Sequence, residues 1–290
     1  MKPAATATME RLEAARRARR SLVVAGVGSG ITARGAASGG ADALAVYNTA
    51  VYRIKGLPTA LAFLPYDDCN AITLDAAPEV IAAAGSTPVF IGFGAHDQRR
   101  ALDQLLDAAE NLGAVGVTNE PFLGMYDATI AAPLTAAGLG FERERELVRR
   151  AVERGLMGFG WAFSPDEASS MIDAGATVIG AMLKEVTTAV EPHDPDADVR
   201  KALESASRQL QEIVARVQRE SSSTFVLIHG GPLNDPRSVE VALQLTGADG
   251  YVTGSTGERH PVERAVADAI RSFKVLATHP ARGPVDEPSP

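Results

Sequence analysis

The chain contains a single cysteine, and this scarcity bears on its redox environment. With only Cys69 among 290 residues, no disulfide can form within the chain. Secreted domains commonly depend on disulfides, so a cytoplasmic location is expected. Cys69 is expected to occupy a small buried or turn position, and a nucleophilic role is the alternative.

Aromatic residues and positive charge are also scarce. Aromatics make up 5% of the chain, and the formal net charge is −8. Nucleic-acid-binding proteins need basic surfaces and often aromatic stacking platforms, so no nucleic-acid partner is expected. The apolar run at 21–27 is too short for a signal sequence or a membrane span, so no membrane partner is expected either.

Three common catalytic or cofactor motifs are missing. The glycine-rich stretch 26–30 lacks the spacing of a dinucleotide-binding fingerprint. No G-x-S-x-G element is present to anchor a serine-hydrolase triad. His96, His193, His260 and His279 lie in different segments and lack the i, i+4 spacing of a zinc-binding helix.

Apolar runs of strand length alternate with helical patterns along the chain. The runs are continuous, which is typical of parallel strands covered on both faces. They are 22–26, 43–47, 89–93, 115–119, 157–163, 177–182, 225–229 and 250–253. Eight such units predict a (β/α)8 TIM barrel, and a doubly wound open sheet is the alternative.

The barrel is expected to cover 21–276. A short helical extension at 1–20 precedes it, and the acidic, proline-rich stretch 277–290 is expected to be disordered. The segment 48–85 is long for one unit and suggests a functional loop before its helix. Helices are expected at 98–111, 142–154, 165–174, 197–219 and 235–245.

Active sites of such barrels lie at the carboxyl ends of the strands, so the residues that follow each run are the candidates. Small and hydroxyl residues follow three of the runs, and their backbone amides can approach an anion closely. They are Gly28, Ser29, Gly230, Gly231, Gly254, Ser255 and Thr256. Ordinary strand-to-helix turns are the alternative interpretation.

Carboxylates follow other runs and suggest a hard-cation site. Asp68, Asp97 and Glu120 are candidate ligands of Mg²⁺, which prefers oxygen and keeps several waters. Such an ion would stabilise an enolate. The alternatives are that Asp68 caps a turn, that Asp97 caps a helix starting near residue 98, and that Glu120 is a solvated charge.

Three further side chains carry chemistry with open alternatives. Arg53 can grip a carboxylate or phosphate, or form a surface ion pair. His229 ends an apolar run and is a candidate acid or base, or else a core histidine bonded to the backbone. Lys184 can form a Schiff base, with an ordinary ion-paired lysine as the alternative.

Several motifs together resemble those of the TIM-barrel phosphoenolpyruvate hydrolase-like family, also called TIM-barrel signal-transduction proteins. The resembling segments are GVGSGITARGAASGGADALAVYN, YRIKGLPTALAFLPYDDCNAI, TPVFIGFGAHD, HGGPLNDP and TGSTGERHPVERAV. The resemblance implies a barrel of the phosphoenolpyruvate/pyruvate superfamily, whose enzymes bind enolates or α-keto acids with Mg²⁺. It places Tyr47, Asn48, Arg53, Asp68, Asn70, Asp97, His229, Gly230 and Gly231 on family motif positions.

The chain departs from the family pattern at positions expected to line the pocket. Glu120 replaces an apolar residue before Pro121, and Arg34 stands where a lysine is expected. Ala189-Val190 replaces a glycine pair, and Thr253–Thr256 replaces a Gly-Ala-Ser-Ser run. These differences predict a different substrate.

The leading hypothesis is an enzyme that cleaves or hydrolyses a C–C, C–O or P–C bond adjacent to a carbonyl. Its substrate would be a small anionic α-keto-acid-like or phosphorylated compound, and the reaction would pass through a stabilised enolate. One alternative is a non-catalytic signalling barrel that binds a small ligand. The other is a metal-free acid/base isomerase or lyase acting on a phosphorylated substrate. A homo-oligomer is also expected.

Overall fold

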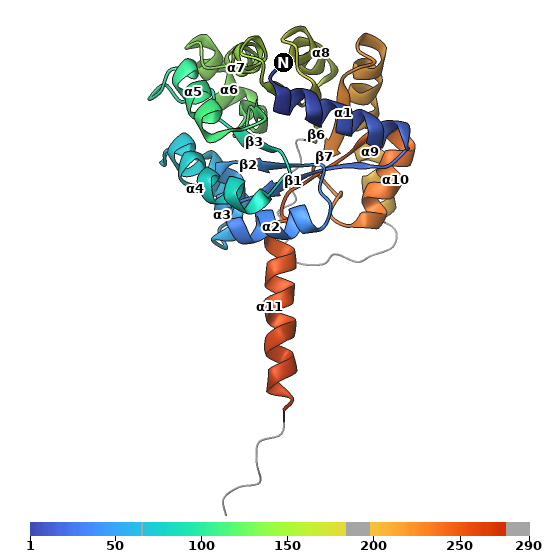
Figure 1. Cartoon of the computed structure of the whole chain (residues 1–290). Coiled ribbons are helices and arrows are strands. Elements are labelled where there is room, and N and C mark those ends of the chain that lie inside the picture. The colour runs from blue at the N-terminus through green and yellow to red at the C-terminus, as the bar shows by residue number, and fades with distance from the viewer. Residues whose placement is uncertain (65, 184–197, 277–290) are drawn as a thin grey trace, which may run out of the picture.

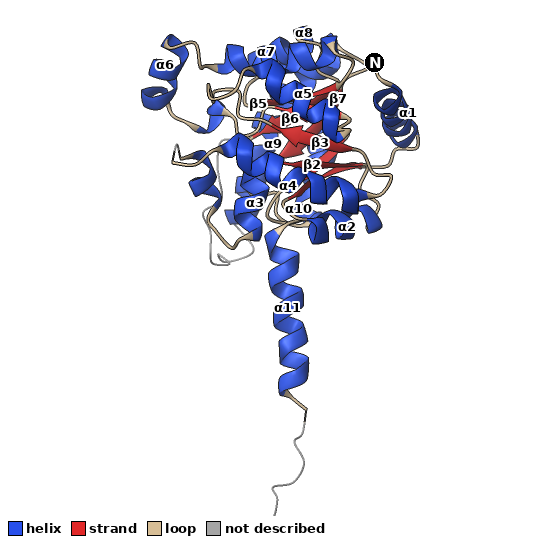
Figure 2. Ribbon diagram, turned by 60° about the vertical axis from the view of Figure 1, so that its left-hand side comes forward, coloured by secondary structure: helices blue, strands red, loops and turns tan. Residues whose placement is uncertain are grey.

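The computed structural model describes residues 1–64, 66–183 and 198–276 and shows a closed barrel of parallel strands surrounded by helices (Figures 1 and 2). The strands follow one another in sequence order, and β8 pairs with β1. They are β1 (Leu22–Val27), β2 (Ala43–Val46), β3 (Val89–Gly92), β4 (Gly116–Thr118), β5 (Met157–Ala162), β6 (Val178–Met182), β7 (Phe225–His229) and β8 (Gly250–Thr253). The predicted (β/α)8 barrel is therefore confirmed, and the open sheet is excluded.

The strands are buried on both faces, which explains their continuous apolar character. Side chains such as Phe90, Phe159 and Trp161 belong to one apolar cluster inside the barrel. Val27 and Ile91 belong to another cluster, which packs under the outer helices. Glycine at inward positions makes room for the large rings; a Cβ on Gly180 would lie 2.3 Å from the Trp161 ring.

The helices are close to the predicted segments, with two differences. They are α1 (Pro3–Arg17), α2 (Gly30–Ser38), α3 (Asn48–Ile54), α4 (Cys69–Ala84), α5 (Leu102–Leu112), α6 (Ala128–Ala136), α7 (Phe141–Glu153), α8 (Pro165–Asp173), α9 (Asp198–Glu220), α10 (Pro236–Thr246) and α11 (Arg259–Lys274). The expected long loop after β2 contains α3, which starts directly at the strand end. Helix α5 begins four residues later than expected, so the prediction that Asp97 caps it was wrong.

Helix α1 packs across the amino ends of the strands. Its buried Leu12 joins the cluster inside the barrel. Arg16 donates hydrogen bonds to the Thr224 carbonyl at 2.8 Å and to Asp249 at 3.0 Å. The opposite end of the barrel, where the strands finish, is left for the site. Lys184 and the stretch 277–290 lie outside the described residues.

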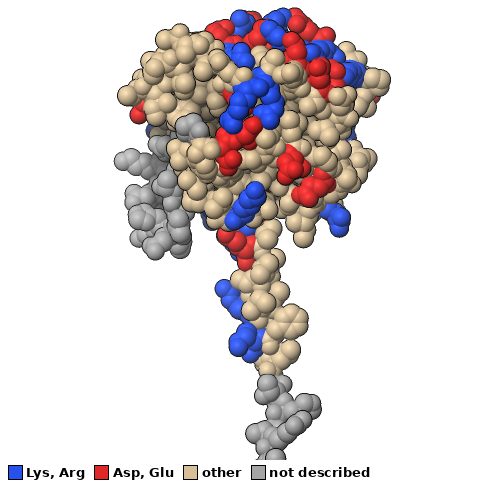
Figure 3. Space-filling view, turned by 90° about the vertical axis from the view of Figure 1, so that its left-hand side faces the viewer, with Lys and Arg blue, Asp and Glu red and all other residues tan. Residues whose placement is uncertain are grey.

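Helix α11 stands away from the barrel in both ribbon views (Figures 1 and 2). None of its residues is buried. Acidic and basic side chains lie over the barrel surface, whereas much of the visible side of the projecting helix is uncharged (Figure 3). Within the described ranges no helix is long and apolar enough to span a membrane.

A buried polar network fixes the end of β4. Asn119 donates its side-chain amide to Glu144 and accepts the Trp161 backbone N–H at 2.7 Å. Glu144 also accepts the Leu123 backbone N–H at 2.7 Å. Its side chain, on α7, is 2% exposed, and burial raises the pKa of its carboxyl to about 8. This network holds the backbone on both sides of Glu120.

We expect Glu144→Gln to destabilise the fold. The new amide nitrogen must face either the Asn119 amide or the Leu123 N–H, and donor then meets donor. One buried donor without an acceptor costs about 1–3 kcal/mol. Denaturant unfolding at pH 7 measures the loss.

Glu142→Gln is the control, because Glu142 lies on the same helix with its side chain 74% exposed. It should change the free energy of unfolding by less than about 0.5 kcal/mol. Equal stability of the two variants would contradict this account.

Candidate active site

Three side chains meet in a buried polar centre where the strands end. Tyr47 follows β2, Arg53 lies one turn further on α3, and Glu258 precedes α11. The Tyr47 hydroxyl donates to Glu258 Oε1 at 3.2 Å, and Arg53 Nη1 donates to both Glu258 oxygens at 3.2 and 2.9 Å. The Glu258 side chain is fully buried, and that of Arg53 is 9% exposed. The centre therefore joins β2 and β8 through one ion pair.

Local structure explains why these side chains reach each other. Arg53 is fixed a second time, because its Nε donates to Thr59 Oγ1 at 3.0 Å. Gly26 on β1 provides the space: a Cβ there would lie 2.1 Å from the Tyr47 hydroxyl oxygen and 2.4 Å from Glu258 Oε1. Any side chain at Gly26 must therefore displace Tyr47 and Glu258.

The electrostatics of the centre are set by burial and by the one cation. Burial is the largest single influence on Arg53 and lowers its pKa, but Glu258, Tyr47 and Glu120 together raise the pKa more, so the guanidinium stays charged. Burial, Glu258 and Glu120 raise the pKa of Tyr47 well above its usual value, so the phenol stays neutral. Among the described residues, no hydrogen-bond partner engages Arg53 Nη2. This atom remains for an oxygen of a bound anion.

Glu120 belongs to the same centre and is not the solvated charge that the alternative interpretation required. The residue is 4% exposed. Burial raises the pKa of its carboxyl to about 8; Arg53 opposes this shift, and Glu258 adds to it. The Thr49 side chain hydrogen-bonds to the carboxyl. Glu120 therefore carries its proton at neutral pH.

His229, at the end of β7, borders the centre. Its Nδ1 lies 2.7 Å from the Val252 carbonyl, so Nδ1 carries the proton and donates, and Nε2 keeps a free lone pair. Burial lowers the pKa of the imidazole to about 4. A Cβ on Gly254 would lie 2.9 Å from His229 Cε1 and 3.1 Å from Arg53 Nη1. His229 is thus a neutral hydrogen-bonding group close to Arg53, and it has the backbone bond that the alternative interpretation expected.

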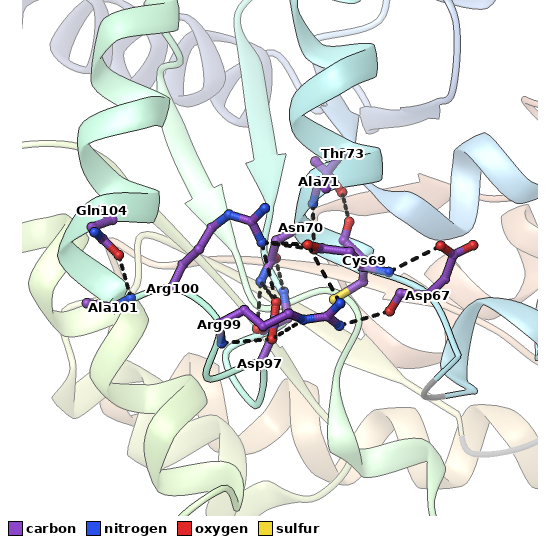
Figure 4. A network of polar contacts seen from close by, with 12 residues as sticks. Asp67, Cys69, Asn70, Ala71, Thr73, Asp97, Arg99, Arg100, Ala101 and Gln104 are labelled. Atoms are coloured by element: carbon purple, nitrogen blue, oxygen red, sulfur yellow. Dashed lines mark hydrogen bonds and ion pairs between the residues drawn. The ribbon is translucent and has the colours of Figure 1, made fainter.

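Asp68, Asn70 and Asp97 form a second network, together with two arginines. Asn70, Asp97 and both arginines are labelled in Figure 4. Asp68 caps α4 through the Ala71 N–H at 2.8 Å and pairs with Arg100 at 2.9 Å. Asp97 accepts from the backbone N–H and from Nε of Arg99, at 3.0 and 2.9 Å. Asn70 donates to Asp97 at 3.2 Å and joins it to the loop after β3.

The electrostatics of this second network do not resemble those of the first. Burial raises the pKa of both Asp68 and Asp97, but hydrogen bonds outweigh it, so both pKa values fall below their usual range. Arg100 and the Ala71 N–H act on Asp68, and Arg99 acts on Asp97. The predicted site residues at the strand ends therefore form two groups that differ in their electrostatics, one around Arg53 and one around Asp97.

These residues do not fit a ready Mg²⁺ site. Asp97 and Glu120, the expected ligand pair, lie in different networks. Asp97 already accepts from a guanidinium, and a protonated Glu120 is a poor ligand. Within 1–64, 66–183 and 198–276 no group of three or more His, Cys, Asp or Glu side chains could hold a metal ion. Arginines take the positions beside the carboxylates that a cation would use.

Several predicted binding residues stabilise the fold through contacts with nearby backbone or side-chain groups. Asn48 donates to the Ala62 carbonyl at 2.9 Å. Asn70 also bonds both backbone groups of Gly94, accepting from its N–H and donating to its carbonyl. Ser29 caps α2 in a capping box with Thr32. Gly28 lets β1 pass α3, because a Cβ there would lie 2.4 Å from the Ala50 carbonyl oxygen.

The two glycine loops differ from each other. Gly230 and Gly231 adopt φ angles of 98° and 55°, a backbone conformation that favours glycine. The loop at 254–258 is a turn, in which Gly257 and Glu258 both donate their N–H groups to the Gly254 carbonyl. In the described part of the chain the N–H groups of Ser255 and Thr256 have no acceptor, so they are available to an anion.

Sequence reasoning missed Glu258, Arg99 and Arg100. Glu258 stands in the quoted TGSTGER motif, but its distance from β8 hid its link to Arg53. The Arg99-Arg100 pair lies two and three residues after the candidate Asp97, and this closeness in sequence was the signal for a neutralised carboxylate. A surface cavity of about 590 Å³ lies between α8 and α9, next to Pro165 and Arg216, and none of the predicted site residues lines it.

Comparisons with known proteins identify the family of this chain. The family model described as phosphoenolpyruvate hydrolase-like matches residues 7–276. The tomato (Solanum lycopersicum) "ToMV susceptible protein tm-1(GCR26)" is 33% identical over 257 residues, which are 88% of this chain and 34% of that protein. The chain thus spans about a third of the length of this curated relative.

Solved structures share the fold at low sequence identity. A crystal structure of 2,3-dimethylmalate lyase, described as a PEP mutase/isocitrate lyase superfamily member, has a TM-score of 0.62 and 16% identity, covering 99% of this chain and 93% of that one. Phosphonopyruvate hydrolase in complex with oxalate and Mg++ has a TM-score of 0.58 and 14% identity, covering 94% and 92%. On the extent of the family match, this chain belongs to the phosphoenolpyruvate hydrolase-like family.

Proposed function

We propose that this protein is an enzyme that cleaves a bond adjacent to a carbonyl in a small anionic α-keto-acid-like substrate, through an enolate. The observation that carries the proposal is the buried pairing of Arg53 with Glu258 beside the buried carboxyl of Glu120, whose pKa burial raises to about 8. A fixed cation and a neutral acid in one dry centre are the two groups that enolate chemistry needs. The lyase and hydrolase among the structural neighbours are consistent with this reaction class.

The residues divide the work as follows. Arg53 Nη2 and the N–H groups of Ser255 and Thr256 bind the anionic oxygens of the substrate. When the bond breaks, its electron pair moves onto the carbonyl and gives an enolate, whose charge Arg53 stabilises. The other fragment leaves as a carbonyl compound, with the proton of its hydroxyl passing to solvent, or it leaves bonded to the oxygen of an attacking water, with a proton of that water passing to solvent. The Glu120 carboxyl then donates its proton to the enolate carbon, and solvent restores that proton. Glu258 and Tyr47 hold the guanidinium in position and are positioning residues.

No step passes through a metal ion, because the carboxylates in this centre are protonated or paired with arginine. Glu120 stands where the family usually has an apolar residue. This departure supports the role of its carboxyl as the proton donor. The signalling-barrel alternative needs no proton donor in its pocket, and a buried carboxyl with a pKa raised to about 8 favours the enzyme.

We expect Glu120→Gln to lower kcat by about 10²-fold or more while KM changes little, because the amide fills the same space but gives no proton. Arg53→Lys should raise KM, since one ammonium cannot hold Glu258 and a substrate oxygen together. Screening α-keto acids and phosphonate or phosphorylated acids finds the substrate. Asp75→Asn, an exposed position on α4, is the control. Full activity of Glu120→Gln on the best substrate would remove Glu120 from the mechanism.

A second test needs no substrate. The pKa of Glu120 in the fold is about 8, above its unfolded value. Its contribution to stability is therefore fully present below about pH 4.3 and is lost as pH rises through 8. Glu120→Gln cannot titrate at this position. Its free energy of unfolding should therefore increase relative to that of the wild type between pH 5 and pH 8.5. Denaturant unfolding at several pH values measures the difference. A constant difference would mean that Arg53 holds Glu120 ionised.

The third test asks whether Arg53 or a metal ion supplies the positive charge of the site. Because Arg53 supplies the positive charge, activity on the best substrate should stay within about twofold of its initial value after treatment with a chelator. Steady-state rates with EDTA, and with added Mg²⁺, measure this. A loss of more than about tenfold that Mg²⁺ restores would show that substrate completes a metal site, with Asp97 as its first ligand.

A further inference from the structure

Four aromatic residues gather beside the polar centre, at the carboxyl ends of the strands. Trp161 lies near the end of β5, and Phe122 and Phe163 follow β4 and β5. The Phe122 ring meets the rings of Trp161 and Phe163 edge to face, with centroids 5.8 and 5.0 Å apart. Phe63, in the short helix η1 (Thr59–Phe63), places a fourth ring 5.6 Å from Phe122. These four residues are called the ring cluster.

The ring cluster begins one side chain away from Arg53. The His229 ring meets the Trp161 ring edge to face, with centroids 5.5 Å apart. His229 Cε1 and Arg53 Nη1 flank one point, the position of a Cβ on Gly254, at 2.9 and 3.1 Å. A molecule bound at Arg53 therefore has the ring cluster close by.

The backbone under the rings is fixed by the buried network around β4. Asn119 accepts the Trp161 backbone N–H, and Glu144 accepts that of Leu123, which follows Phe122. Phe122 and Trp161 are only 1% and 2% exposed. A surface held in this way can bind a ligand with little further loss of side-chain freedom.

The ring cluster reaches solvent at its outer rim. Phe63, Phe163, Met125 and Met182 are only partly buried, and they pack against the apolar cluster inside the barrel. Met182 ends β6, so the apolar rim extends from η1 to that strand. Partly exposed apolar side chains next to a few fixed polar groups are typical of a ligand pocket.

The ring cluster also carries one donor without an acceptor. Within the described ranges of the chain, the buried Trp161 Nε1 has no hydrogen-bond partner. Buried tryptophan N–H groups usually have an acceptor. The π-face of an aryl ring accepts a weak hydrogen bond from an N–H group, and an alkyl group does not. The rings and the N–H group thus both favour an aromatic ligand.

The charges of the centre favour a ligand with a single carboxylate. Glu258 already balances the charge of Arg53. A second anionic group on the ligand would lie against the rings, where it would lose water without gaining a partner. A phosphonate or a distal carboxylate is therefore a poor match to this side of the site.

We propose that the substrate is an α-keto acid with one carboxylate and an aryl tail, and that the ring cluster binds the tail. This inference rests on the function proposed above and narrows its substrate class. Arg53 and the N–H groups of Ser255 and Thr256 bind the carboxylate end. The rings exclude water around the tail, which favours departure of the tail as an aryl aldehyde over attack by water.

The aldol adduct of pyruvate and benzaldehyde is a compound of this class, and its cleavage balances without a co-reactant. The C–C bond between the two halves breaks, and its electron pair forms the enolate of pyruvate. The hydroxyl proton passes to solvent as benzaldehyde leaves. Glu120 then protonates the enolate carbon and gives pyruvate.

Calorimetric titration of the wild type tests the tail preference without turnover. Phenylbutyrate has the carbon skeleton of the adduct but neither the carbonyl nor the hydroxyl. Butyrate lacks its ring, and glutarate has a second carboxylate instead. Phenylbutyrate should bind at least tenfold more tightly than either, because burying about 60 Å² of apolar surface gives roughly that factor. Absent phenylbutyrate binding, or equal or tighter binding of butyrate or glutarate, would overturn the proposal.

Cyclohexylbutyrate separates an aromatic tail from a merely apolar one. It has nearly the same size as phenylbutyrate but no π-face for the ring edges and for Trp161 Nε1. It should bind at least threefold more weakly than phenylbutyrate. Equal or tighter binding of cyclohexylbutyrate would rule out the aryl preference.

Variants at the rim show whether the ring cluster is the binding surface. Phe163→Gln should lower the affinity for phenylbutyrate at least fivefold, and Met182→Gln at least twofold. Both should bind butyrate within twofold of wild type, which shows that the Arg53 end is intact. Leu245→Gln is the control, because Leu245 is 48% exposed at the end of α10, and it should change neither affinity. Wild-type affinity for phenylbutyrate in Phe163→Gln or in Met182→Gln would overturn the role of the ring cluster.

Pyruvate release separates this inference from the proposed function. The benzaldehyde adduct of pyruvate should be cleaved with a kcat/KM at least tenfold above those of the acetaldehyde and glyoxylate adducts. If either of these is cleaved as efficiently, the proposed function stands and the aryl preference is wrong. If phenylbutyrate binds most tightly but no adduct releases pyruvate, the proposed cleavage is wrong and the aryl-binding site stands.

Discussion

A guanidinium removed from water must find its compensation inside the protein, and Arg53 finds it in Glu258. The cost of desolvating both ions is met only when geometry is favourable and the remaining hydrogen-bonding atoms are satisfied. Two bonds to the carboxylate, one to Thr59 and one from Tyr47 meet this condition in part. Among the described residues Arg53 Nη2 is left without an acceptor. Residues 205 apart in sequence are thereby tied together, and the second and last units of the barrel share one centre.

The carboxyl groups near this centre differ in their pKa values and in their partners, although all of them belong to Asp or Glu. Glu120 lies deep and keeps its proton, and Glu144 lies deep but serves the backbone around β4. Asp68 is partly exposed and Asp97 is buried, but arginines pair with both and lower the pKa of each. Depth and the nearest cation, rather than residue type, decide which carboxyl can donate a proton at neutral pH.

The sequence was sufficient for the barrel, because parallel strands buried on both faces have a distinct apolar pattern. Prediction from the sequence was less accurate where the chain changes direction. The helix α3 was missed because it starts inside what looked like a loop, and Asp97 was assigned to a helix that begins only at Leu102. The side chain of Asp97 instead closes a turn onto Arg99, a local contact that residue spacing does not reveal. Arg53 was named from its chemistry, but its partner was not.

Sequence alone determined the order of the strands, the end of the barrel where functional groups lie, and the glycine-rich turns there, since these follow from local patterns and chain connectivity. Only the tertiary structure decided which groups meet, because closing the barrel brings β1, β2 and β8 together and places Glu258 against Arg53 and Tyr47. It also decided protonation, since burial depth is a property of the packed molecule.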